Sequence, residues 1–173
     1  MLETITILCL SGALITLCLL SYIDIKTFLL PNKLVGSLAT LALILHITRA
    51  FDIISLHDAT YGALAGFWTL YIIRALGNAY YKQDSLGLGD VKLLGAAGIW
   101  LGLEGVFFAI TLGAFAGLIH GLIYAGYLSI KHQKPFSISR LRIPAGPGFA
   151  TGIIFVGFWI YGSAFLKALH SLI

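Results

Sequence analysis

Residues 86–102 read LGLGDVKLLGAAGIWLG, a glycine-containing turn that ends at Asp90 and is followed by glycine, alanine and large apolar residues. After Asp90, only Lys92 is charged in this stretch. A helix that is apolar on every face is buried either in a protein interior or in lipid. The stretch therefore predicts a buried or membrane-embedded helix with a carboxylate at its beginning.

The same composition continues through the whole chain. Of its 173 residues, 59% are hydrophobic and only 10% are charged, and the mean hydropathy is +0.97. A soluble domain has about 25% charged residues, so this chain has too few charges to cover a water-exposed surface. We predict an all-α integral membrane protein, a single polytopic domain over residues 1–173 that is surrounded by the lipid bilayer.

About 20 apolar residues are needed for one membrane-spanning helix. The sequence has six apolar runs separated by short polar connections, and we predict six transmembrane helices from them: Thr4–Ile23, Leu34–Ile47, Ala59–Ile73, Val91–Leu103, Gly105–Ile130 and Gly148–Leu169. The fourth run is short and rich in glycine and alanine.

The basic residues predict the orientation of these helices. Nine of the eleven lie in or beside the first, third and fifth connections, namely Lys26, Lys33, Arg74, Lys82, Lys92, Lys131, Lys134, Arg140 and Arg142. Only Arg49 and Lys167 lie on the opposite side. Because cytoplasmic loops are enriched in lysine and arginine, we expect these connections to face the cytoplasm and both termini to face outward.

Three aspartates lie on this predicted cytoplasmic side, Asp24, Asp84 and Asp90, and the first and last of them are next to an apolar run. Asp24 follows the first run and Asp90 precedes the fourth, so a folded bundle can bring them together at the inner interface. Taken singly, each has a structural interpretation: Asp24 can mark a helix end, and Asp90 can be an N-cap, as can Asn32 after Pro31. Ionisable groups at membrane depth are costly, however, and indicate a functional site.

Three ordered motifs resemble one family, the bacterial type IV prepilin peptidases. Gly87-Leu-Gly-Asp90 matches the GxGD signature of membrane aspartyl proteases, and residues 86–102 are similar to the second active-site region of the prepilin peptidases. Asp24 followed by Leu30-Pro31-Asn32 resembles the first region, an aspartate followed by Ile-Pro-Asn. Ile143-Pro-Ala-Gly-Pro147 is similar to a Pro-Phe-Gly-Pro segment near the last helix.

The resemblance implies an aspartic endopeptidase of the bacterial inner membrane, with an active site at the cytoplasmic interface. Its substrates would be prepilin or pseudopilin precursors, which have a short basic leader before an apolar helix and are usually cut after a glycine. Asp24 and Asp90 would be catalytic, supported by Gly87, Gly89, Pro31 and Asn32. Glycines beside a catalytic carboxylate would let a substrate backbone approach closely.

Paired carboxylates suit peptide hydrolysis because one can activate water while the other protonates the leaving amine. We expect no cofactor and no metal, since the five histidines are scattered along the chain, and no nucleic-acid partner. The two cysteines, Cys9 and Cys18, form no CxxC pair. Longer prepilin peptidases have a cytoplasmic segment with two such pairs that is associated with N-methylation, so we expect the peptidase portion alone.

Two other functions remain open from the residues alone. Asp24 and Asp90 could relay protons or cations in a small transporter, since acidic pairs in membrane proteins also serve that purpose. The chain could also be a non-catalytic membrane scaffold. Against transport, the acids lie near the interface rather than at mid-membrane, and the spans show no clear inverted repeat.

Overall fold

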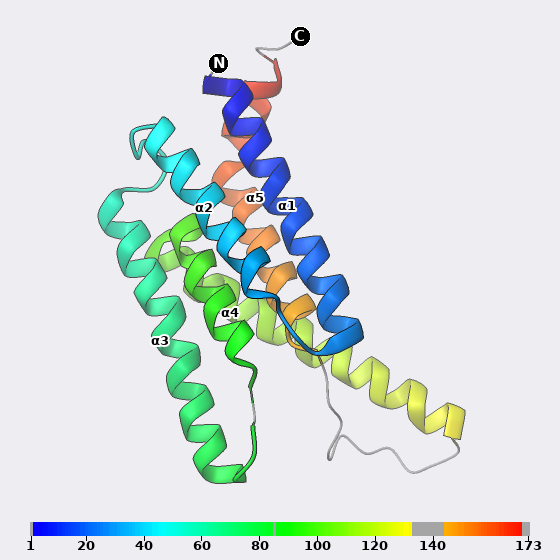
Figure 1. The fold of residues 1–173 in the computed structure, drawn as a ribbon. Helices are drawn as coiled ribbons and strands as arrows, with labels where there is room; N and C mark the ends of the chain where they lie inside the picture. The colour runs from blue at the N-terminus through cyan, green and yellow to red at the C-terminus, as the bar shows by residue number, and fades with distance from the viewer. Residues whose placement is uncertain (1, 85, 133–143, 171–173) are drawn as a thin grey trace.

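The computed structural model describes residues 2–84, 86–132 and 144–170. These residues form an all-helical bundle without strands, which confirms the predicted helical class (Figure 1). The helices are α1 (Leu2–Thr27), α2 (Asn32–Thr48), α3 (Leu56–Tyr81), α4 (Leu88–His132) and α5 (Gly146–His170). Lys134, Arg140, Arg142 and Ile143, which the topology and motif predictions used, lie outside the described residues.

Helix α4 bends sharply at Gly102. Its backbone there has φ 70° and ψ −176°, a conformation that residues with a Cβ rarely adopt. The part before the bend, 88–101, runs away from the Asp90 end, and the part after it, 103–132, turns back (Figure 1). The fourth and fifth predicted runs, which we separated at Glu104, are therefore distinct helical segments. The break between them lies at Gly102, two residues before Glu104.

Two predicted helix ends were wrong. Helix α1 continues to Thr27, so Asp24 lies inside its last turn rather than after the helix. Helix α3 continues to Tyr81, whereas the predicted third helix ended at Ile73 and left 74–81 in the connection that follows. This segment has no proline to stop the helix, which ends only where Lys82 adopts the left-handed conformation. The error came from equating the end of an apolar run with the end of a helix.

Among the described residues, three helices are long and apolar enough to cross a membrane: α1, α5 and residues 88–131 of α4. Helix α2 is apolar but shorter, with 17 residues. Large apolar side chains on these helices point away from the protein core. Phe158 and Trp159 of α5, for example, are 76% and 84% exposed. Such surfaces are unfavourable in water and match a lipid environment, as expected for a membrane protein.

Glycines let the helices pack with their backbones in contact. A Cβ on Gly66 of α3 would lie 2.3 Å from the Leu94 carbonyl oxygen of α4, and one on Gly62 would lie 2.5 Å from that of Gly98. On the other side of α4, a Cβ on Gly152 of α5 would lie 2.3 Å from the Ala109 carbonyl oxygen. In lipid, where hydrophobicity does not drive helix association, this close packing holds α3 and α5 against α4.

Replacing Gly66 with alanine should therefore destabilise the bundle, because the added methyl group collides with backbone that cannot move aside. Overpacking of this kind costs about 1–3 kcal/mol. Thermal unfolding in detergent should show a lower midpoint for Gly66→Ala than for the wild type.

Gly36→Ala is the matched control, since a Cβ at Gly36 of α2 would have no neighbour within 4 Å. Its midpoint should stay level or rise, because alanine is the better helix former. Equal midpoints for the two variants would contradict the close packing of α3 on α4.

Candidate active site

Four helix ends meet at one end of the bundle, opposite the two termini (Figure 1). They are the last turn of α1 and the first turns of α2, α4 and α5. Asp24 and Asp90 lie on two of these ends and are both buried, with 5% and 7% of their surface exposed. The structure thus brings the two predicted aspartates into one site.

Asp24 is held by the beginning of the last helix. Its Oδ2 accepts a hydrogen bond of 2.8 Å from the backbone amide of Gly146, the first residue of α5. The free amides at a helix N-terminus favour a negatively charged group, so α5 provides a suitable partner for this carboxylate. A Cβ at position 146 would lie 2.8 Å from the same oxygen. The glycine therefore leaves room for the carboxylate at this contact.

Asp90 lies in the first turn of α4, two residues after its beginning at Leu88. It is not the N-cap: the carboxylate reaches back and accepts a hydrogen bond from the Gly87 backbone amide. A Cβ on Gly87 would lie 2.9 Å from Asp90 Oδ2, so the glycine makes room for the carboxylate. The other oxygen, Oδ1, is buried and has no hydrogen-bond partner among the described residues.

The two carboxylates are close enough to interact electrostatically. Two negative charges that are largely removed from water are costly, and a shared proton relieves the repulsion. Such a pair can accept a proton at one oxygen and donate one at another, which is the requirement for general acid–base catalysis. Asp90 Oδ1, to which no described residue donates, is available to water or a substrate atom.

The Leu30-Pro31-Asn32 motif forms the turn that leads from Asp24 back into the bundle. Phe28, in the left-handed conformation, ends α1 and donates its backbone amide to the Asp24 carbonyl oxygen. Leu30 packs beside Gly89, where a Cβ would lie 2.7 Å from the Leu30 Cβ. The turn after Asp24 and the turn before Asp90 are thus packed directly against each other.

Pro31 and Asn32 make different contacts in the turn beside the aspartates. Pro31 is the N-cap residue of α2, and its carbonyl oxygen accepts the amides of Leu34 and Val35. Asn32 is not the N-cap of α2, although the sequence analysis gave this as its structural interpretation. Its Oδ1 instead accepts a hydrogen bond of 3.0 Å from Lys92 Nζ, which joins the start of α2 to the start of α4.

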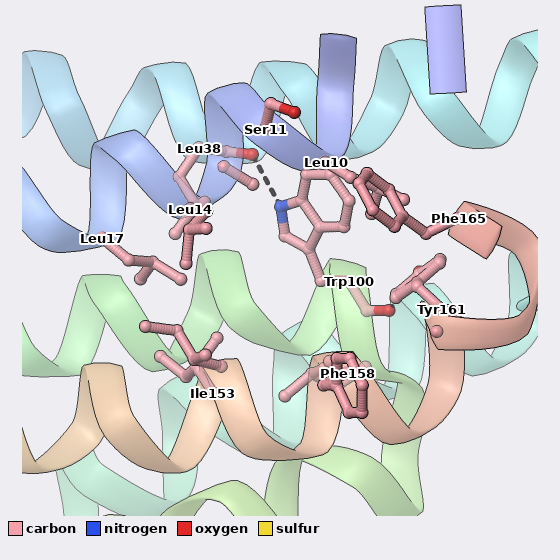
Figure 2. Close-up of a pocket in the computed structure, with 15 residues that line it drawn as sticks. Leu10, Ser11, Leu14, Leu17, Leu38, Trp100, Ile153, Phe158, Tyr161 and Phe165 are labelled. Carbon is pink, nitrogen blue, oxygen red and sulfur yellow. Dashed lines mark hydrogen bonds between the residues drawn. The ribbon is translucent and has the colours of Figure 1, made fainter. Parts of the chain in front are cut away.

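A cavity of about 350 Å³ lies between α1, α4 and α5, away from the aspartates (Figure 2). Its lining is almost entirely apolar and includes Leu14, Leu17, Ile153 and Phe158. The polar groups of its two hydrogen-bonding aromatic residues already have partners. Trp100 Nε1 donates to the Leu38 carbonyl oxygen at 2.9 Å, and the Tyr161 hydroxyl donates to the Trp100 carbonyl oxygen. The cavity suits hydrocarbon, and neither aspartate is among its lining residues.

Gly146 binds Asp24, but the sequence analysis did not select it as a site residue. Its segment was noted only as the third family motif, and no pattern in the sequence shows that its amide reaches Asp24, 122 positions away. In the described ranges 2–84, 86–132 and 144–170, no three histidine, cysteine or acidic residues lie together in a way that could hold a metal ion.

Comparison with known proteins gives a consistent result. Residues 12–122 match the type IV leader peptidase family. A prepilin leader peptidase/N-methyltransferase of Pectobacterium carotovorum subsp. carotovorum is 36% identical over 147 residues, which cover 83% of this chain and 50% of that protein. The protein of the same name from Escherichia coli K12 is 36% identical over 104 residues, 60% of this chain and 45% of that protein.

A third relative of this name, from Neisseria gonorrhoeae, is 31% identical over 116 residues, 66% of this chain and 40% of that protein. The chain thus spans about half the length of the curated relatives that it matches. No solved structure matches the chain.

The charge repulsion between the aspartates predicts an effect on stability. Asp90→Asn should raise the midpoint of thermal unfolding at pH 8, because it removes a buried carboxylate next to Asp24 and offers an amide donor in its place. Relief of such repulsion by about 1 kcal/mol corresponds to about 2–4 °C for a chain of this size.

Glu104→Gln changes the net charge equally at an exposed position after the bend in α4, and should leave the midpoint unchanged. A lower midpoint for Asp90→Asn than for Glu104→Gln would show that the Asp90 carboxylate stabilises the fold, in contradiction to the predicted repulsion.

Proposed function

Since the chain belongs to the type IV leader peptidase family, we propose that it is an aspartic endopeptidase that removes the basic leader from prepilin-like precursors. The observation that carries this proposal is the pair of buried carboxylates, Asp24 and Asp90, which come from different helices and interact at one end of the bundle. The names of the relatives support the substrate class.

In the proposed reaction, the pair shares one proton and activates a water molecule. The ionised carboxylate takes a proton from the water, whose oxygen attacks the carbonyl carbon of the scissile peptide bond. The protonated carboxylate donates its proton to the leaving amine nitrogen as the C–N bond breaks. The two groups titrate as a unit, so the acid and base roles belong to the pair rather than to one residue.

The surroundings hold each carboxylate in place for this reaction. The Gly146 amide fixes Asp24 Oδ2, and the Gly87 amide binds the Asp90 carboxylate. Preformed hydrogen bonds of this kind reduce the reorganisation that the reaction requires. Asp90 Oδ1, which has no partner among the described residues, is the oxygen that we assign to water.

The proposed location is the bacterial inner membrane, with six spans and both termini outside. The bend at Gly102 supports six spans because it divides α4 into two segments that run in different directions. Lys26, Lys33 and Lys92 lie on the helix ends that surround the aspartates, and this supports a cytoplasmic site. A precursor with a cytoplasmic leader and an apolar helix would present its boundary at this level.

The proposal covers the peptidase reaction only. N-methyltransferase appears in the names of longer relatives, of which this chain matches half or less. Within residues 1–173, the two cysteines are nine positions apart and form no CxxC pair.

Asp24→Asn and Asp90→Asn should each lower the rate of precursor cleavage at least about 100-fold, the usual loss when a general acid or base is removed. The measurement is conversion of a prepilin to its mature size in membranes that contain each variant at equal levels, with sequencing of the new N-terminus.

The control is Glu104→Gln, which should cleave at the wild-type rate. Undiminished cleavage by either aspartate variant would overturn the two-aspartate mechanism. Absence of cleavage by the wild type with prepilins and pseudopilins alike would overturn the substrate class.

The proposed orientation predicts which positions a membrane-impermeant thiol reagent can reach. In a variant without Cys9 and Cys18, a cysteine at Gln83, between α3 and α4, should react only after the cells are opened. A cysteine at His57, near the start of α3, should react in intact spheroplasts. The reverse pattern would contradict an active site on the cytoplasmic side.

A further inference from the structure

Arg74 of α3 binds the turn that leads into Asp90. Its Nε donates to the Leu86 carbonyl oxygen at 2.8 Å, and its Nη2 donates to Asp84 Oδ1 at 2.7 Å. The arginine side chain is only 20% exposed, while that of Asp84 is 80% exposed. One guanidinium group thus bonds to two points of the short connection between α3 and α4.

This connection needs an external anchor. The last turns of α3 extend past the start of α4, and the connection runs back alongside them (Figure 1). Gly87 and Gly89, at its end, have no side chains that could hold the turn in place. The fork of Arg74 supplies fixed donor directions at this point, which a flexible ammonium group does not.

The anchor is linked to the catalytic carboxylate through consecutive residues. Arg74 fixes the carbonyl group of Leu86, and the peptide bond at that carbonyl carries the amide nitrogen of Gly87. The Gly87 amide in turn binds the Asp90 carboxylate. A shift of the Leu86–Gly87 peptide group would therefore move the hydrogen-bond donor that orients Asp90.

We propose that Arg74 is a positioning residue for Asp90, an inference that rests on the proposed peptidase function. Arg74 acts through the Leu86–Gly87 peptide group and contacts neither carboxylate of the pair. Asp84 neutralises its charge, and Asn78 Nδ2 also donates to Asp84 Oδ1, at 3.2 Å. This pairing keeps a cation from repelling a basic leader. It also means that Asp84, the third acidic residue on this side, has an internal partner.

The proposal assigns the positioning of Asp90 to the Arg74–Leu86 bond and not to the Arg74–Asp84 ion pair. Three variants and one control distinguish the two bonds. Arg74→Gln removes both bonds, Arg74→Lys can keep the ion pair but not the bond to Leu86, and Asp84→Asn removes the ion pair alone. Lys33→Gln is the matched control, because it removes one exposed positive charge from the same end of the bundle. Each variant is purified into lipid nanodiscs and assayed with a prepilin for kcat and KM.

Arg74→Gln should lower kcat at least about tenfold with KM within about twofold, because a small misplacement of a catalytic group costs rate rather than binding. Arg74→Lys should lose nearly as much, whereas Asp84→Asn and Lys33→Gln should stay within about threefold of the wild type. An unchanged kcat in Arg74→Gln, or a change in KM alone, would overturn the proposal. Equal losses in Asp84→Asn and Arg74→Gln would also overturn it.

Hydrogen exchange of the backbone amides from Gly87 to Asp90 gives a readout that does not depend on activity. Arg74→Gln and Arg74→Lys should speed their exchange about tenfold, the effect of losing one charge-assisted hydrogen bond, while the amides of residues 93–101 stay protected. Unchanged exchange from Gly87 to Asp90 would overturn the positioning role. If the wild type cleaved no precursor, the proposed function would fail, and this exchange would still decide whether Arg74 holds the turn.

Discussion

The hydrogen bond from the Gly146 amide to Asp24 Oδ2 joins the first helix of the chain to the last. It places a carboxylate at a helix N-terminus, buries it, and brings α1 and α5 together at the end where α4 begins. The rest of the site follows from this convergence: Leu30 packs against Gly89, and the Gly87 turn brings Asp90 beside Asp24. Removal of the Gly146 contact would leave a buried charge without its partner, which is far more costly than the loss of an exposed one.

The sequence was sufficient to predict the helical membrane fold and to single out the two aspartates, because each depends on composition or on short motifs. The ends of α1 and α3 were missed, since these helices continue beyond their apolar runs as far as Thr27 and Tyr81. The contacts between helices that are distant in the sequence were not predictable either. The bonds from Gly146 to Asp24 and from Arg74 to Leu86 depend on the packing of different helices, which no local pattern encodes.

The placement of the polar groups favours hydrolysis over transport. Both aspartates lie at one end of the bundle, and neither lines the cavity between α1, α4 and α5, whose lining is almost entirely apolar (Figure 2). Beyond the aspartates, Trp100, Tyr161 and His46 bond to backbone carbonyl groups and tie α4 to α2 and α5. The two aspartates thus lie at the helix ends, and these side-chain bonds hold α2, α4 and α5 together in the apolar body of the bundle.

The central claim is that Asp24 and Asp90 act as a single catalytic unit. Residues that act as a unit are strongly non-additive, because removal of one already removes the function of the other. The most direct test compares the residual cleavage rates of Asp24→Asn, Asp90→Asn and the double variant in nanodiscs, with the product quantified by mass spectrometry. We predict that the double variant retains the same residual rate as the slower single variant. A double-variant loss equal to the product of the two single losses would show that the aspartates act independently, and would contradict the shared site.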